Sequence, residues 1–170
     1  MKIKISGVFL AILVLSGLSL QAKKISDSAQ KLVTGLYEML TINNTTLPDW
    51  NQVRKCFNPE AIIVLRSTLT ESKVLDVDGF IADFQHFIEN SDVVELGFSE
   101  TVLNCKGEVF GNTAWYSVVY EAKIHGTDRK NTGVDHFSLV NLDGEWKIVS
   151  IVNEVVTPNR PLPDFLKLNF

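Results

Sequence analysis

Residues 134–156 read VDHFSLVNLDGEWKIVSIVNEVV, two runs of alternating apolar and polar residues on either side of Asp143-Gly144. An Asp-Gly pair in this setting indicates a β-hairpin, because the two-residue turn that matches the twist of the strands needs positive φ at both central positions. The turn also fixes the register of the strands. With Asp143 and Gly144 as the loop, Phe137 lies opposite Ser150 and Asp135 opposite Val152.

This register predicts which side chains share a face of the sheet, because directly opposed residues lie on the same face. The predicted face consists of Asp135, Phe137, Leu139, Trp146, Ile148, Ser150, Val152 and Glu154. Asp135 and Glu154 are therefore neighbouring carboxyl groups among large apolar side chains, where one can raise the pKa of the other, as general acid–base catalysis requires. The alternative is that both carboxyl groups are solvated, or that Arg66 or Arg129 pairs with one of them.

The N-terminus has the layout of a secretory signal peptide over residues 1–22. Lys2 and Lys4 precede an uncharged apolar run from Val8 to Leu15, and the small residue Ala22 marks the expected cleavage point. The rival interpretation is an uncleaved anchor, but the apolar run is shorter than the ~20 residues that span a bilayer. We expect a secreted or periplasmic protein with no stable membrane insertion after cleavage.

Charge and cysteine content limit the partners. The net charge is −4 and the basic residues are scattered, so we expect no nucleic-acid partner. Cys56 and Cys105 can form a disulfide in an oxidising compartment, or remain two separate core thiols. No histidine or cysteine stands at metal-ligand spacing beside either, so we expect no metal site.

The order of elements predicts a single α+β domain over residues 25–157, followed by a C-terminal arm over residues 158–170. Apolar periodicity indicates three N-terminal helices, near residues 26–40, after Pro48 and near residues 78–90. A strand near residues 61–66 with a short partner, and four long strands from Val93 onward, make up the rest. We expect the helices to pack on one face of a curved, mainly antiparallel sheet.

This order, the Gly111-Asn112-Thr-Ala114-Trp segment and the closing Asp135–Ile148 segment resemble the nuclear-transport-factor-2-like (NTF2-like) superfamily, whose cone-shaped, cystatin-like fold includes SnoaL-like and ketosteroid-isomerase-like proteins. The closing segment is most similar to lumazine-binding-like secreted members. The resemblance covers roughly Ile25 to Val156. It implies a fold more than a chemistry, because the superfamily hosts isomerases, cyclases, dehydratases, transport factors and immunity proteins.

The resemblance also implies a location for a site, inside the cone between the helices and the concave sheet. The side chains expected to line a ligand pocket there are Tyr37, Tyr116, Tyr120, Phe137, Trp146 and Ser150. The acidic base of the isomerases would be sought near the first strand, where this chain has Ile62 to Leu65, so no catalytic role carries across.

Three functions remain open. The leading hypothesis is a non-catalytic domain that binds a small, partly apolar ligand in its cone. The second is an isomerase, dehydratase or cyclase that needs no cofactor and uses Asp135 and Glu154 on a cyclic carbonyl compound. The third is an interaction module that forms a homodimer through the opposite hairpin face, His136, Ser138, Val140, Val149 and Ile151.

Overall fold

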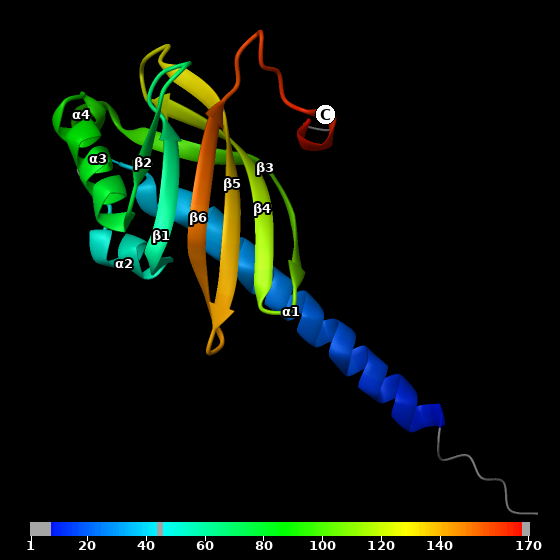
Figure 1. The fold of residues 1–170 in the computed structure, drawn as a ribbon. Helices are drawn as coiled ribbons and strands as arrows, with labels where there is room; N and C mark the ends of the chain where they lie inside the picture. Colours follow the sequence, from blue (N-terminus) through cyan, green and yellow to red (C-terminus); the bar gives the residue numbers. More distant parts are fainter. Residues whose placement is uncertain (1–7, 44–45, 168–170) are drawn as a thin grey trace, which may run out of the picture.

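A computed structural model describes residues 8–43 and 46–167 of the chain (Figure 1). The helices are α1 (Val8–Leu40), α2 (Trp50–Lys55), α3 (Val77–Glu89), α4 (Val93–Leu96) and the 3-10 turn η1 (Asp164–Leu166). The strands are β1 (Phe57–Arg66), β2 (Ser72–Leu75), β3 (Phe98–Phe110), β4 (Thr113–Ile124), β5 (Lys130–Leu142) and β6 (Glu145–Val155). Residues 1–7 of the predicted signal peptide lie outside the described residues.

All six strands form one sheet in the order β2-β1-β6-β5-β4-β3. Strands β1 and β6 run parallel and the other neighbours are antiparallel. Helix α1 crosses one face of the curved sheet and contacts β3, β4 and β6, while α3 packs on β1 and β2 (Figure 1). The predicted α+β architecture, with helices packed on a mainly antiparallel sheet, is confirmed.

The helix count differs from the prediction, because the segment expected to open the first long strand forms the short helix α4 instead. Gly97 follows this helix with a φ of 89°, a left-handed conformation that ends the helix and lets Phe98 begin β3. The helices expected after Pro48 and near residues 78–90 are found as α2 and α3. Asp49 accepts backbone N–H groups of α2 and Asp76 accepts the N–H of Gly79 in α3.

The β5–β6 hairpin turns at Asp143 and Gly144, whose φ values are 53° and 93°. Its register departs from the prediction at a β-bulge. Leu139 pairs with Ile148 as expected, but the next pair is Ser138 with Ser150, so Val149 is an extra residue on β6. A slip of one residue moves every later side chain to the other face.

The bulge moves three residues of the predicted apolar face, Ser150, Val152 and Glu154, to the other face, and it moves Ile151 from the predicted dimer face to the concave face. Asp135 pairs with Asn153, and Phe137 pairs with Ile151, so Asn153 and Ile151 share the concave face with them. Glu154 pairs with Val134 instead and belongs to the other face, as does Ser150. The predicted Asp135–Glu154 carboxyl pair on one apolar face is therefore wrong.

The C-terminal arm folds back onto the convex face of the sheet. Leu166 is fully buried against Val119 and Val134. The side-chain amide of Asn104 donates a 3.2 Å hydrogen bond to the Leu166 carbonyl. The neighbouring Phe165 remains exposed, so Leu166 is the side chain that anchors the arm.

Candidate functional site in the cone

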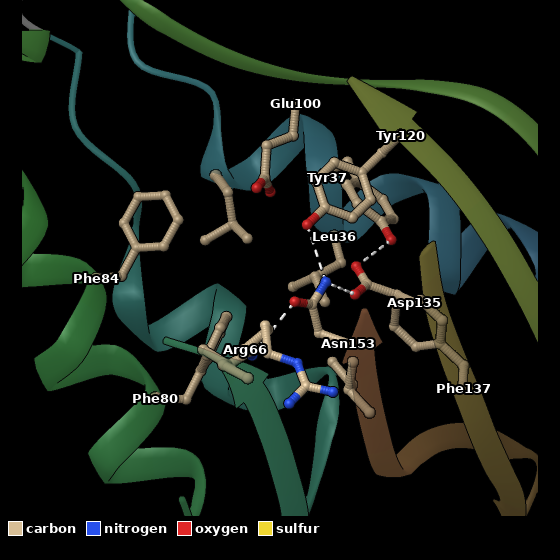
Figure 2. Close-up of a pocket in the computed structure, with 13 residues that line it drawn as sticks. Leu36, Tyr37, Arg66, Phe80, Phe84, Glu100, Tyr120, Asp135, Phe137 and Asn153 are labelled. Atoms are coloured by element: carbon tan, nitrogen blue, oxygen red, sulfur yellow. Dashed lines mark hydrogen bonds between the residues drawn. The ribbon is translucent and has the colours of Figure 1, made fainter. Parts of the chain in front are cut away.

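A cavity of about 210 Å³ lies between α1, α3 and the concave face of the sheet (Figure 2). Its apolar wall consists of Leu36, Leu40, Leu65, Phe80, Phe84, Phe137 and Ile151. Its polar side chains are Tyr37, Arg66, Glu100, Tyr120, Asp135 and Asn153. Apolar walls with a few convergent polar groups are typical of small-molecule sites.

Asp135 is the buried centre of the polar group. The Tyr37 hydroxyl donates a 2.6 Å hydrogen bond to its Oδ2, and the Asn153 amide donates a 2.7 Å hydrogen bond to its Oδ1. Burial raises the pKa of Asp135 to about 6, while the bonds from Tyr37 and Asn153 lower it. The carboxyl group of Asp135 therefore gains or loses its proton at a pH closer to neutral than an exposed aspartate does.

Asn153 connects the surrounding strands. Its Nδ2 also donates to the Tyr120 hydroxyl oxygen at 2.9 Å, and its Oδ1 accepts the backbone N–H of Arg66 at 3.3 Å. Because Tyr120 accepts this bond, its own O–H is left over, and it has no acceptor among the described residues. Burial raises the pKa of Tyr120 above its usual range, so the hydroxyl stays protonated and can donate a hydrogen bond to a ligand.

Glu100 faces the same cavity from β3, where it pairs with Ala122 (Figure 2). Within the described part of the chain its carboxyl group makes no hydrogen bond or ion pair. Burial, and to a lesser degree the charge of Asp135, raise its pKa to about 8. The cavity thus combines two carboxyl groups with raised pKa values, of which that of Glu100 is the higher.

Gly133 makes room for this arrangement. It stands opposite Tyr120 in the β4–β5 pair, and a Cβ atom at this position would lie 2.4 Å from the Tyr120 hydroxyl oxygen. Only glycine allows the tyrosine ring to lie across this strand.

Four of the predicted site residues line the cavity: Tyr37, Tyr120, Asp135 and Phe137. The other ligand candidates lie elsewhere. Tyr116 and Trp146 are buried in the core, where the Tyr116 hydroxyl donates a 3.2 Å bond to the Ser26 carbonyl. Ser150 is on the opposite face beyond the bulge.

Glu154, predicted as a catalytic partner of Asp135, forms ion pairs with Arg66 at 2.5 Å and Arg160 at 2.7 Å. The hydrogen bond from Arg66 is the main reason that the pKa of Glu154 lies below its usual range. A carboxyl group held ionised in this way is unsuited to a role as general acid.

Of the two alternatives left open for the cysteines, the structure shows separate thiols, and both Cys56 and Cys105 are free. Cys56 directly precedes β1 and Cys105 lies on β3, and β6, β5 and β4 separate these strands. Strands lie ~4.8 Å apart, whereas the Cα atoms of a disulfide lie within ~7 Å. Cys56 is instead buried with its Sγ 3.8 Å from the Met39 Sδ.

The described residues contain no cluster of histidine, cysteine or acidic side chains that could hold a metal ion. Among the same residues, no helix combines the length and apolar character needed to cross a membrane.

No protein-family model matches the sequence, and curated proteins give no match. Solved structures do match. An NTF2-like protein with a cystatin-like fold from Novosphingobium aromaticivorans is 9% identical with a TM-score of 0.62, over 91% of this chain and 96% of that one. A proposed dehydratase of the NTF2-like family from Streptomyces avermitilis is 13% identical with a TM-score of 0.62, over 79% of this chain and 98% of that one.

A third structure, an uncharacterised protein with a cystatin-like fold from Caulobacter vibrioides, is 14% identical with a TM-score of 0.59, over 78% of this chain and 90% of that one. Similarity at identities this low shows a shared fold, and the function of this chain has to be argued from the residues of its own cavity.

Proposed function

This chain has the NTF2-like, cystatin-like fold, and we propose that its cone binds a small, partly apolar molecule. The observation that carries the proposal is that two polar groups, the Tyr120 O–H and the Glu100 carboxyl, face an apolar cavity without a described partner. Both residues are partly buried, and polar groups that line such a cavity without a protein partner can bond a ligand. A ligand with one donor or acceptor near these groups and an apolar body against Phe80 and Phe84 supplies what is missing.

The size of the cavity limits the ligand. Pockets for drug-sized molecules have volumes of ~300–1,000 Å³, whereas this one measures about 210 Å³. A compact molecule of about one ring is the class that fits.

The test is binding of a fragment library of single-ring compounds, followed by NMR chemical shifts of the cavity residues. Tyr120→Phe keeps the shape of the wall and removes one donor, so it should weaken the best fragment ~5- to 10-fold. Tyr116→Phe removes a core hydroxyl outside the cavity and serves as the matched control. A library with no fragment that shifts Tyr37, Tyr120 or Asn153 resonances contradicts the proposal.

A second candidate function is acid–base catalysis without a cofactor, as in an isomerase, dehydratase or cyclase. The observation that favours it is the pair of carboxyl groups on one cavity, with the pKa of Asp135 at about 6 and that of Glu100 at about 8. Such a pair provides a base and an acid at neutral pH. Glu100 thus takes the place of Glu154 in this hypothesis, and the structurally similar proposed dehydratase from Streptomyces avermitilis is consistent with it.

Exchange of α-hydrogens tests this candidate. The protein in D₂O should accelerate deuterium uptake at C6, the sp³ α′-carbon of 2-cyclohexenone, measured by ¹H NMR. The reason is that Asp135 abstracts a C6 proton to give the enol, with Tyr120 or Glu100 donating a hydrogen bond to the carbonyl oxygen, and the enol then takes up deuterium at C6. Asp135→Asn should reduce the acceleration by ~100-fold or more, with Tyr116→Phe unchanged. Equal rates for wild type and Asp135→Asn leave ligand binding as the only function proposed for the cone.

We also propose that the protein is exported and that its N-terminal signal peptide is cleaved. Ser26, shortly after the expected cut at Ala22, already contacts the body through Tyr116, so cleavage there would leave this contact in place. N-terminal sequencing of the protein recovered from a secreting host checks the cut, and an intact Met1 contradicts it.

A further inference from the structure

We propose that the molecule bound in the cone carries a carboxylate group, and that Arg66 at the rim of the cavity receives it. This inference rests on the proposed binding function and adds the chemical class of the ligand.

Arg66 is the last residue of β1 and lines the cavity, with 21% of its side chain exposed. Its guanidinium uses Nε and Nη2 to bind the two oxygens of Glu154, at 3.2 and 2.5 Å. A guanidinium has five N–H donors. Both hydrogens of Nη1 therefore have no acceptor among the described residues, and Arg66 is itself a lining residue of the cavity.

The charge around Arg66 is not balanced by this pairing. Oε1 of Glu154 also accepts a 2.7 Å bond from Arg160 of the C-terminal arm. Two guanidinium groups thus share one carboxylate, so the cluster of Arg66, Arg160 and Glu154 carries one net positive charge. An anionic ligand group supplies the missing negative charge, and an arginine fork binds a planar carboxylate with favourable geometry.

The inner end of the cavity sets the orientation. Asp135 already accepts hydrogen bonds from Tyr37 and Asn153, so its negative charge disfavours a second anion at depth. The ligand's carboxylate therefore belongs at Arg66, and its uncharged polar end belongs near Tyr120 and Glu100. Figure 2 shows Glu100 and Arg66 on opposite sides of the ring of lining residues, with Asn153 between them.

The experiment compares each acid with its own amide at pH 7, using benzoate against benzamide and cyclohexanecarboxylate against its amide. Affinities come from NMR titration of the cavity resonances. We expect the acids to bind ~10- to 100-fold more tightly than the amides. Arg66→Gln should abolish this preference, and Arg66→Lys should retain part of it. Arg54→Gln, which removes a surface arginine paired with Asp78, is the matched control.

Glu154→Gln should give a result that a purely structural role of Arg66 would not predict. It removes the competing carboxylate, so the acids should bind more tightly than to wild type, while the amides are unaffected. This variant also decides the question if Arg66→Gln fails to fold.

Each outcome points to one conclusion. Acids and amides of equal affinity overturn the carboxylate inference and leave binding in the cone intact, as does weaker acid binding by Glu154→Gln. A cavity that binds neither acids nor amides overturns the proposed binding function itself.

Discussion

Tyr37 on α1 donates a 2.6 Å hydrogen bond to Oδ2 of Asp135 on β5, and this buried contact ties the helix to the concave face of the sheet. The residues are 98 positions apart in the chain. The bond stabilises the ionised carboxylate and fixes one wall of the cavity, so structure and chemistry depend on the same pair.

Tyr37→Phe should therefore raise the pKa of Asp135 further above about 6, because the Tyr37 bond lowers it in the wild type. Loss of a buried bond to a charged group should also cost about 1–3 kcal/mol of unfolding free energy. Carboxyl-detected NMR titration measures the first effect and urea denaturation the second. An Asp135 pKa that stays the same contradicts this account, and Tyr116→Phe controls for loss of a tyrosine hydroxyl outside the cavity.

Gly133→Ala should destabilise the protein, because the new Cβ would lie 2.4 Å from the Tyr120 hydroxyl oxygen and displace the ring. We expect a loss of about 1–3 kcal/mol and loss of the Asn153–Tyr120 bond. Combined with Tyr120→Leu, the same alanine should cost little, so a double-mutant cycle should show a positive coupling. Gly35→Ala is the control, because no atom lies within 4 Å of a Cβ there and alanine favours the helix.

Much of the fold follows from local signals in the sequence. The Asp143-Gly144 turn and the starts of the helices after Pro48 and near residue 78 depend on signals within a few residues, so they could be predicted and are found in the structure. Tyr37, Tyr120 and Phe137, which were expected to line the pocket, do line the cavity.

Two cavity residues that were not predicted from the sequence, Asn153 and Glu100, face the cavity because a β-bulge lies in the strand of each. The extra residue Val149 brings Asn153 to the concave face. Counting back from the Gly111-Asn112 turn puts Glu100 opposite Lys123, but the extra residue Leu103 moves it opposite Ala122, on the face of Tyr120. Bulges re-aim side chains, and neither bulge is marked by a glycine, so regular alternation could not reveal them.

The free thiols lead to a direct chemical check. Titration of the denatured, unreduced protein should find two thiols per chain, because Cys56 and Cys105 are both free. Addition of a reductant should leave the unfolding midpoint unchanged. A count of zero would establish the disulfide and contradict the strand order that separates the two residues.

The C-terminal arm should shield the convex face from self-association. Removal of residues 158–170 takes away Leu166 and uncovers Val119 and Val134, which are buried beneath it. The truncated chain should dimerise at lower concentration than the full chain, as measured by light scattering, and Leu166→Ala should cost about 2–5 kcal/mol. Phe165→Ala, at an exposed neighbour, is the control. A truncated chain that stays monomeric, with unchanged stability, contradicts a protective role.

Because the pKa of Glu100 is raised in the folded protein, the free energy of unfolding should depend on pH. The folded protein holds this proton up to about pH 8, whereas the unfolded chain releases it near the ordinary value of 4.5. Between these values the unfolded state binds fewer protons, so the contribution of Glu100 to the unfolding free energy falls as the pH rises. Asp135 contributes with the same sign between 3.8 and about 6.

Glu100→Gln keeps the shape of the protonated side chain and removes its titration. Its stability relative to wild type should therefore increase from pH 4.5 to pH 8, as measured by urea denaturation at several pH values. Glu108→Gln, at an exposed position of the same strand, is the matched control for a lost acidic residue on β3. A constant difference between Glu100→Gln and wild type across this range would show that Glu100 is ionised in the folded cone at neutral pH, and the acid–base pairing with Asp135 would then have to be abandoned.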